Sequence, residues 1–140
     1  MDIVFDFDGV LCEYQGWRGH DNIGEPIMPM VDLVIDLHKK GHKLKLCTTR
    51  LNPHPFGDER IDEDVVSLKA KRTIIDWLDR HGILDCFVEI TGYKPYGEYY
   101  IDDRALRYGD GRDGIHHTLD APDIMALINY QEENKDDINV

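Results

Sequence analysis

In this chain of 140 residues, the segment IVFDFDGVL, residues 3–11, is the clearest indication of the fold. It opens with the apolar run Ile3–Phe5, which contains β-branched residues and is typical of a buried strand. Asp6 and Asp8 follow at the carboxyl end of this strand, and Gly9 then breaks the pattern. Burying carboxylates is costly unless a cation or a ligand offsets their charge. The stretch therefore predicts a strand whose carboxyl end binds a cation or a reacting ligand.

Strands and helices alternate outward from this stretch. The spacing of apolar residues predicts strands over 44–47, 86–90 and 99–101, and helices over 29–40, over about 62–81 and from Asp120, with Asp123 as its capping partner. This alternation implies right-handed crossovers and a mainly parallel sheet. We expect an α/β fold, a Rossmann-like three-layer sandwich in which ligands bind beyond the carboxyl ends of the strands.

Length, charge and cysteine content limit the number of domains, the kinds of partner and the location that we expect for this protein. A chain of 140 residues builds one core, so we expect one domain over residues 1–140, with an acidic tail of about ten residues at its end. The formal net charge of −12 disfavours general attraction to nucleic acid and to anionic membranes. The three cysteines lack zinc-site spacing, and no apolar run approaches the ~20 residues of a membrane span. We therefore expect a cytoplasmic protein.

Four acidic residues at strand ends suit phosphoryl chemistry. Asp6 is a suitable nucleophile for phosphorus because water readily hydrolyses the resulting acyl phosphate. Asp8 could protonate the leaving alkoxide and later deprotonate that water. Asp102 and Asp103 end the predicted strand 99–101 and add oxygen ligands for a hard divalent cation, which would offset the charge of an anionic substrate.

Hydroxyl and basic groups complete this set. Thr48, with Thr49 beside it, follows the predicted strand 44–47 and could hydrogen-bond phosphoryl oxygens together with nearby backbone N–H groups. Lys94 lies eight residues before Asp102 and could add a positive charge. Arg50 and Arg104 directly follow these segments, and each could either orient the substrate or tie loops together by ion pairs.

The chain resembles the haloacid dehalogenase superfamily in four motifs, which occur in the superfamily's order. The matches are an apolar strand with DxDGxL at residues 3–11, a strand ending in Thr at 44–48, a lysine before a later strand at Lys94, and an apolar strand ending in DD at 100–103. One DxDG alone is a moderately specific signal, but four motifs across about a hundred residues are a strong one.

The resemblance implies the roles of the acidic residues. Asp6 would be the nucleophile, and Asp8 would be the general acid/base that also offers its backbone carbonyl to the metal. The metal would be Mg²⁺, held by Asp6, Asp8, Asp102 and Asp103. The resemblance thus predicts a phosphatase that hydrolyses a phosphomonoester through an aspartyl-phosphate on Asp6.

Two departures from the superfamily pattern affect the substrate. Val10 stands where many of its phosphatases have Thr, and the segments between motifs, 11–43 and 51–93, are too short for a large cap domain. The chain therefore resembles capless members, whose open sites take bulky substrates or borrow a wall from a neighbouring subunit in a homo-oligomer. Residues Trp17–His20 and 52–60, which include His54, are candidates for the rim of such a site.

Several functions stay open at this point. The substrate is expected to be a small phosphorylated molecule, either a sugar phosphate or a nucleotide. The local sequence around Thr48 and Asp102 also resembles that of the 3′-phosphatase domain of polynucleotide kinases, so an oligonucleotide 3′-phosphate is a further alternative. Rival functions are a receiver-like domain that stores phosphate on Asp, and a catalytically inactive scaffold that binds phosphate ligands. Dehalogenation is disfavoured because the acidic pair and its metal suit phosphoryl transfer.

Overall fold

The described residues of this computed structural model are 1–52, 63–109 and 118–134, with the backbone alone over 63–67. They divide into two compact units, Met1–Asp103 and Arg104–Val140, and each unit is described by itself. The single domain expected from the chain length stays a prediction.

Helices and strands alternate along the described part of the first unit. Its elements are β1 (Asp2–Phe5), α1 (Met28–Lys39), β2 (Lys43–Cys47), the 3₁₀-helix η1 (Thr49–Leu51), α2 (Glu63–Arg80), the 3₁₀-helix η2 (Leu84–Cys86), β3 (Phe87–Thr91) and β4 (Tyr99–Ile101). Their bounds lie close to the predicted ones. The prediction of Cys86 as a strand residue was wrong, because its N–H donates to the carbonyl of Ile83 at 3.1 Å and closes a 3₁₀ turn.

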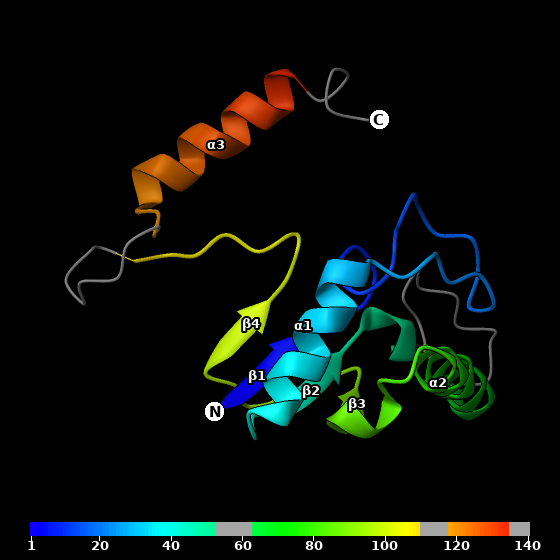
Figure 1. Ribbon diagram of the computed structural model, residues 1–140. Coiled ribbons are helices and arrows are strands. Elements are labelled where there is room, and N and C mark those ends of the chain that lie inside the picture. Colours follow the sequence, from blue (N-terminus) through cyan, green and yellow to red (C-terminus); the bar gives the residue numbers. More distant parts are fainter. Residues whose placement is uncertain (53–62, 110–117, 135–140) are drawn as a thin grey trace. The chain divides into compact units, whose positions relative to one another are not determined.

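The four strands form one parallel sheet in the order β3-β2-β1-β4. The chain moves from β1 through β2 to β3 on one side and then returns to β4 on the other side of β1 (Figure 1). The predicted Rossmann-like α/β fold with a parallel sheet is therefore confirmed. In open sheets of this kind, ligands bind beyond the strand ends at the point where the strand order reverses. Here that point lies between β1 and β4.

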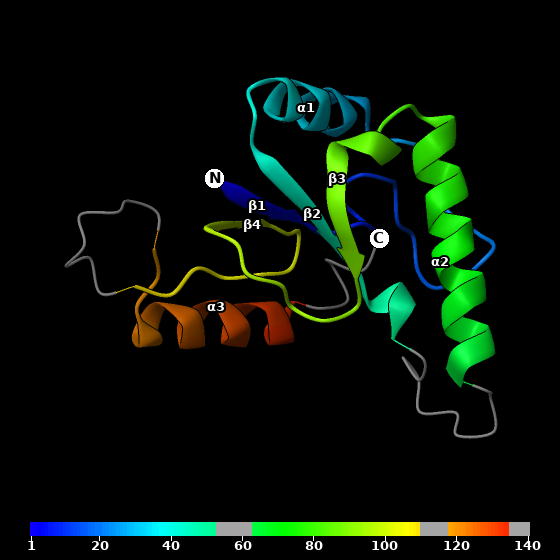
Figure 2. The same cartoon turned by 90° about the horizontal axis from the view of Figure 1, so that it is seen from below.

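One face of the sheet packs against the two crossover helices. Ile3 pairs with Leu44 and Phe5 with Leu46, so their side chains share a face. They belong to one buried cluster with side chains of α1 and α2: Val31, Val34, Ile74, Trp77 and Leu78. Figure 1 shows α1 lying across β1 and β2, and both views show α2 on the side of β3 (Figures 1 and 2). This shared core holds the ends of β1 and β2 in place beneath the site.

The opposite face is more polar. Val4 is buried there, and its neighbour Lys45 forms an ion pair with Asp2 at 3.0 Å and donates to the carbonyl of Tyr96 at 2.8 Å. A Cβ on Gly97 would lie 2.5 Å from a methyl group of Val4, so the loop before β4 crosses this face closely. In the described part of the first unit no further domain is inserted between strands, in agreement with the expected absence of a large cap.

The second unit contains α3 (Ala121–Glu133). Its predicted capping box is confirmed, because the Asp120 side chain accepts from the Asp123 N–H at 2.9 Å and the Asp123 side chain accepts from the Asp120 N–H at 3.4 Å. No residue of α3 is buried. Within the segment predicted as an acidic tail, α3 continues to Glu133, and residues 135–140 lie outside the described residues, so the tail stays a prediction. None of the described helices combines the length and the apolar character that crossing a membrane requires.

Candidate active site

Three acidic side chains meet where the strand order reverses. Asp6 follows β1, and Asp102 and Asp103 follow β4. The two strand ends are joined by a hydrogen bond of 2.9 Å from the Asp6 N–H to the Ile101 carbonyl. One carboxylate oxygen from each of the three residues lies within 4.8 Å of the others. The structure thus brings together three of the four residues predicted to hold a metal.

Electrostatics in this cluster oppose full ionisation in the absence of a counter-charge. Burial, and after it the neighbouring carboxyl groups of Asp102 and Asp103, raise the pKa of Asp6 from its ordinary value of 3.8 to about 7. A hydrogen bond of 2.8 Å from the Phe7 N–H to Asp6 Oδ1 acts in the opposite direction. The site therefore favours the binding of either a proton or a cation.

Gly9 makes the close approach of Asp103 possible. Its backbone has a φ of +82°, a conformation that residues other than glycine rarely adopt. A Cβ at this position would lie 2.2 Å from Asp103 Oδ2, far inside van der Waals contact. The glycine of the DxDG motif thus serves two purposes, a left-handed turn and room for the third carboxylate.

The carboxylate of Asp8 lies in a different set of contacts, centred on Arg50. The guanidinium of Arg50 donates from Nε to Asp8 Oδ2 at 2.7 Å and from Nη2 to Asp8 Oδ1 at 2.8 Å. The thiol of Cys12 also contacts Asp8 Oδ1, at 3.6 Å. The Asp8 carboxylate is therefore not a member of the acidic cluster, and the predicted use of its backbone carbonyl as a metal ligand stays a prediction.

The predicted phosphate-binding residues differ in exposure. Thr48 is only 2% exposed, and its hydroxyl accepts from the Arg50 N–H at 3.2 Å, which caps η1. Thr49 is exposed at the start of η1. Lys94 is also exposed, and its ammonium lies 4.8 Å from the centre of the Tyr100 ring. Arg104 is exposed and is the first residue of the second unit.

The loop after the first motif borders a pocket of about 280 Å³. Arg50 lines this pocket together with Tyr14, Arg18, Asn22 and other residues of the loop. Within the predicted rim segment Trp17–His20, the two aromatic rings lie edge to face with centres 4.9 Å apart. His20 Nδ1 is buried and has no hydrogen-bond partner among the described residues. Most of the other rim segment, including His54, lies outside the described residues.

Sequence reasoning missed several contributors to this site. The backbone carbonyls of His20 and Asn22 accept hydrogen bonds from Arg50, at 3.3 and 3.0 Å, and a backbone carbonyl has no signature in the sequence. Trp77 of α2 donates from its indole N–H to the Gly24 carbonyl at 3.2 Å and so anchors the same loop. The steric role of Gly9 had a signal, because glycine directly after the second motif acid suggests a special turn.

Comparisons with known proteins give little beyond this geometry. No family model matches the chain, and no curated protein matches it either. A solved structure of a conserved protein from Bacteroides thetaiotaomicron is similar at 23% sequence identity, over 94% of this chain and 91% of that chain, with a TM-score of 0.48. A likeness of this degree does not extend to function.

Proposed function

We propose that this protein is a Mg²⁺-dependent phosphatase that hydrolyses a phosphomonoester through an aspartyl-phosphate on Asp6. The observation that carries this proposal is the acidic cluster of Asp6, Asp102 and Asp103, whose carboxylate oxygens lie within 4.8 Å of one another. The cluster lies at the switch point of a parallel sheet, where such folds bind ligands. A purely structural role would not require three neighbouring carboxylates there.

The donor set fits a hard divalent cation. Its three members are carboxylates, which are the ligands that Mg²⁺ and Ca²⁺ prefer, and cysteine and histidine are absent from it. The raised pKa of Asp6 supports the same conclusion, because burial and the two neighbouring carboxyl groups disfavour its ionised form until a cation binds. When bound, Mg²⁺ would offset the negative charge of the phosphoryl group and of Asp6. Asp6, Asp102 and Asp103 are the residues that would hold it.

The side chains divide the chemistry between them. An oxygen of Asp6 attacks phosphorus as the bond from phosphorus to the ester oxygen breaks, and the ester oxygen leaves with the bonding electrons and takes a proton from Asp8. Water then attacks phosphorus and gives a proton back to Asp8, which releases phosphate and restores the Asp6 carboxylate. We assign this proton to Asp8 Oδ2, because Oδ2 accepts one hydrogen bond, from Arg50, whereas Oδ1 accepts from both Arg50 and the Cys12 thiol.

The phosphoryl oxygens need donors, and we assign these to exposed groups. Thr49 is exposed directly after Thr48, and we assign its hydroxyl as a donor, because the Arg50 and Leu51 N–H groups of η1 already donate to Thr48. Thr48 is almost completely buried, which makes direct phosphate contact by its hydroxyl less favourable than support of this loop. Lys94 is exposed and would supply positive charge from the loop before β4.

A substrate panel tests the proposal. Purified protein with Mg²⁺ is assayed for phosphate release from sugar phosphates, nucleotides and 3′-phosphorylated oligonucleotides, with a chelator as the metal control. We expect hydrolysis of at least one class, and a loss of at least about a thousandfold in kcat for Asp6→Asn. Asp36→Asn, an exposed acid on α1, is the matched control and should retain full activity.

Two results would contradict the proposal. The first is no turnover of any phosphomonoester, and the second is full activity of Asp6→Asn. Treatment with acetyl phosphate separates the receiver-like alternative, because a phosphate-storing domain would accumulate a long-lived phosphoprotein by mass spectrometry. Because the net charge of −12 repels a polyanion, we expect small phosphorylated substrates to be hydrolysed faster than oligonucleotides in the panel.

A further inference from the structure

Arg50 is a charged side chain placed almost entirely inside the protein. Its side chain is 4% exposed, while that of its partner Asp8 is 18% exposed. The two hydrogen bonds to Asp8, of 2.7 and 2.8 Å, form a bidentate pair that fixes the plane of the carboxylate. A buried guanidinium is tolerated only where its charge and its donors are satisfied, so this pair is an essential part of the local structure.

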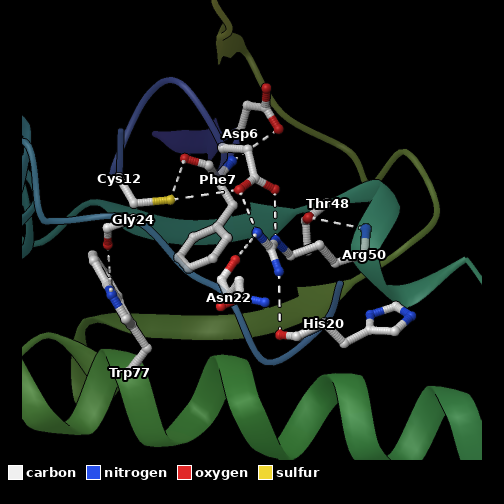
Figure 3. A network of polar contacts seen from close by, with 10 residues as sticks. Asp6, Phe7, Cys12, His20, Asn22, Gly24, Thr48, Arg50 and Trp77 are labelled. Atoms are coloured by element: carbon white, nitrogen blue, oxygen red, sulfur yellow. Dashed lines mark hydrogen bonds and ion pairs between the residues drawn. The ribbon is translucent and has the colours of Figure 1, made fainter. Parts of the chain in front are cut away.

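The same guanidinium also holds the loop that follows the first motif. Nη1 donates to the His20 carbonyl at 3.3 Å, and Nη2 donates to the Asn22 carbonyl at 3.0 Å. Its central carbon lies 5.1 Å from the centre of the Trp17 ring and 5.8 Å from that of the Phe7 ring. Figure 3 shows the guanidinium of Arg50 beside His20 and Asn22 of this loop. Arg50 therefore contacts Asp8 and the loop at the same time.

We propose that Arg50 is a positioning residue that makes the orientation of the Asp8 carboxylate depend on the placement of the loop 17–24. The inference rests on the proposed function, in which Asp8 is the general acid/base. It follows from geometry, because turning the Asp8 carboxylate breaks the bidentate pair, and moving the loop removes two acceptors from the guanidinium. Lysine cannot replace Arg50, since an ammonium lacks the planar fork that makes these bonds together.

The leaving group of the substrate gives a selective readout. In the first step the ester oxygen leaves with the electrons of the bond to phosphorus and takes the proton of Asp8. An alkoxide requires this proton, whereas p-nitrophenolate is stable enough to leave without it. A misplaced Asp8 should therefore impair the hydrolysis of alkyl esters selectively. General damage to the fold would impair both kinds of ester alike.

The experiment compares kcat/KM for p-nitrophenyl phosphate and for glycerol 2-phosphate, with Mg²⁺ present. We expect Arg50→Lys to lower the value for the alkyl ester by about 10- to 100-fold and the value for p-nitrophenyl phosphate by less than about threefold. Arg72→Lys, an exposed arginine on α2, is the matched control and should change neither. Equal losses with both esters, or no loss with either, would overturn the proposal.

A double-mutant cycle tests the link between Arg50 and Asp8. The alkyl-selective loss caused by Arg50→Lys should disappear in the Asp8→Asn background, because Asp8 is the residue that Arg50 acts through. A full additional loss in that background would show that Arg50 acts by another route and would overturn the proposal.

A measurement without substrate separates this inference from the proposed function. In protein labelled with 5-fluorotryptophan, the Trp17 signal is identified with Trp17→Phe and followed by fluorine NMR. Asp8→Asn should shift the Trp17 signal in otherwise native protein but not in the Arg50→Lys background. An unchanged signal, or the same shift in both backgrounds, would refute the link. A native protein without phosphatase activity would refute the proposed function, and the NMR comparison would then decide the link by itself.

Discussion

Replacing Asp6 by asparagine should stabilise the metal-free protein more at pH 8 than at pH 5. Burial and the adjacent carboxyl groups of Asp102 and Asp103 raise the pKa of Asp6 to about 7 in the folded protein, whereas the ordinary value is 3.8. Asparagine carries no charge at any pH in this range. The substitution therefore removes the cost of ionising this position next to two other acids.

The direction of the pH effect follows from proton binding. Between pH 4 and 7 the folded protein holds a proton on Asp6 that the unfolded chain has lost. The contribution of Asp6 to the free energy of unfolding is therefore fully present below pH 4 and is lost as the pH rises through about 7. Metal-free native protein should thus become less stable between pH 5 and 8.

The pKa shift sets an upper limit on the contribution of Asp6 to the free energy of unfolding. Each unit between the folded and unfolded pKa corresponds to about 1.4 kcal/mol, which gives at most about 4 kcal/mol for Asp6. Asp6 is only half-buried, so water screens part of this charge. We therefore expect a decrease of about 1–2 kcal/mol between pH 5 and 8 in native protein relative to Asp6→Asn.

Urea unfolding in the presence of a chelator measures this difference at pH 5, 6, 7 and 8. Asp36→Asn on α1 is the matched control, since its carboxylate is exposed, and its pH dependence should follow that of the native protein. Parallel pH dependences of native protein and Asp6→Asn would show that ionising Asp6 does not destabilise the folded protein. Added Mg²⁺ should stabilise the native protein at pH 8 more than at pH 5, because the metal and the proton compete for the same carboxylate.

Two further substitutions test the turn and the core, each against a matched control. Gly9→Ala should strain the backbone by about 1–2 kcal/mol and also push Asp103 out of the cluster, so that Mn²⁺ affinity falls in a titration. Gly41 has a similar φ of +88° but open space around it. Gly41→Ala should therefore lower the stability of the protein without changing its Mn²⁺ affinity. Leu78→Ala should cost about 2–5 kcal/mol in urea unfolding, because the side chain is fully buried in α2. Leu68 of the same helix is 71% exposed, so Leu68→Ala should cost less than about 0.5 kcal/mol.

Local patterns were sufficient to predict the sheet and the position of the acidic cluster. A short β-branched run before Asp6 and another apolar run before Asp102 each indicated a strand, and parallel strands bring their carboxyl ends to one edge. The convergence of Asp6, Asp102 and Asp103 follows from this topology without knowledge of side-chain positions. The distances within the cluster and the space at Gly9 required the structure.

The environment of Asp8 was beyond sequence reasoning. Its main partner, Arg50, is 42 residues away along the chain, and the equal alternatives for Arg50 were substrate contact and an ion pair between loops. The structure supports the second alternative. The acceptors at His20 and Asn22 are backbone carbonyls, which every residue carries, so no pattern of residue types could have identified them. Burial of Thr48 likewise depends on how η1 folds back after β2.

Calorimetric titration of the metal-free protein with Mn²⁺ determines whether Asp6, Asp102 and Asp103 form one cation site. We predict one site per chain in native protein and at least about a tenfold weaker affinity in Asp102→Asn. Asp36→Asn should bind Mn²⁺ as the native protein does. Equal Mn²⁺ affinity in native protein and Asp102→Asn, or no binding in either, would contradict this prediction.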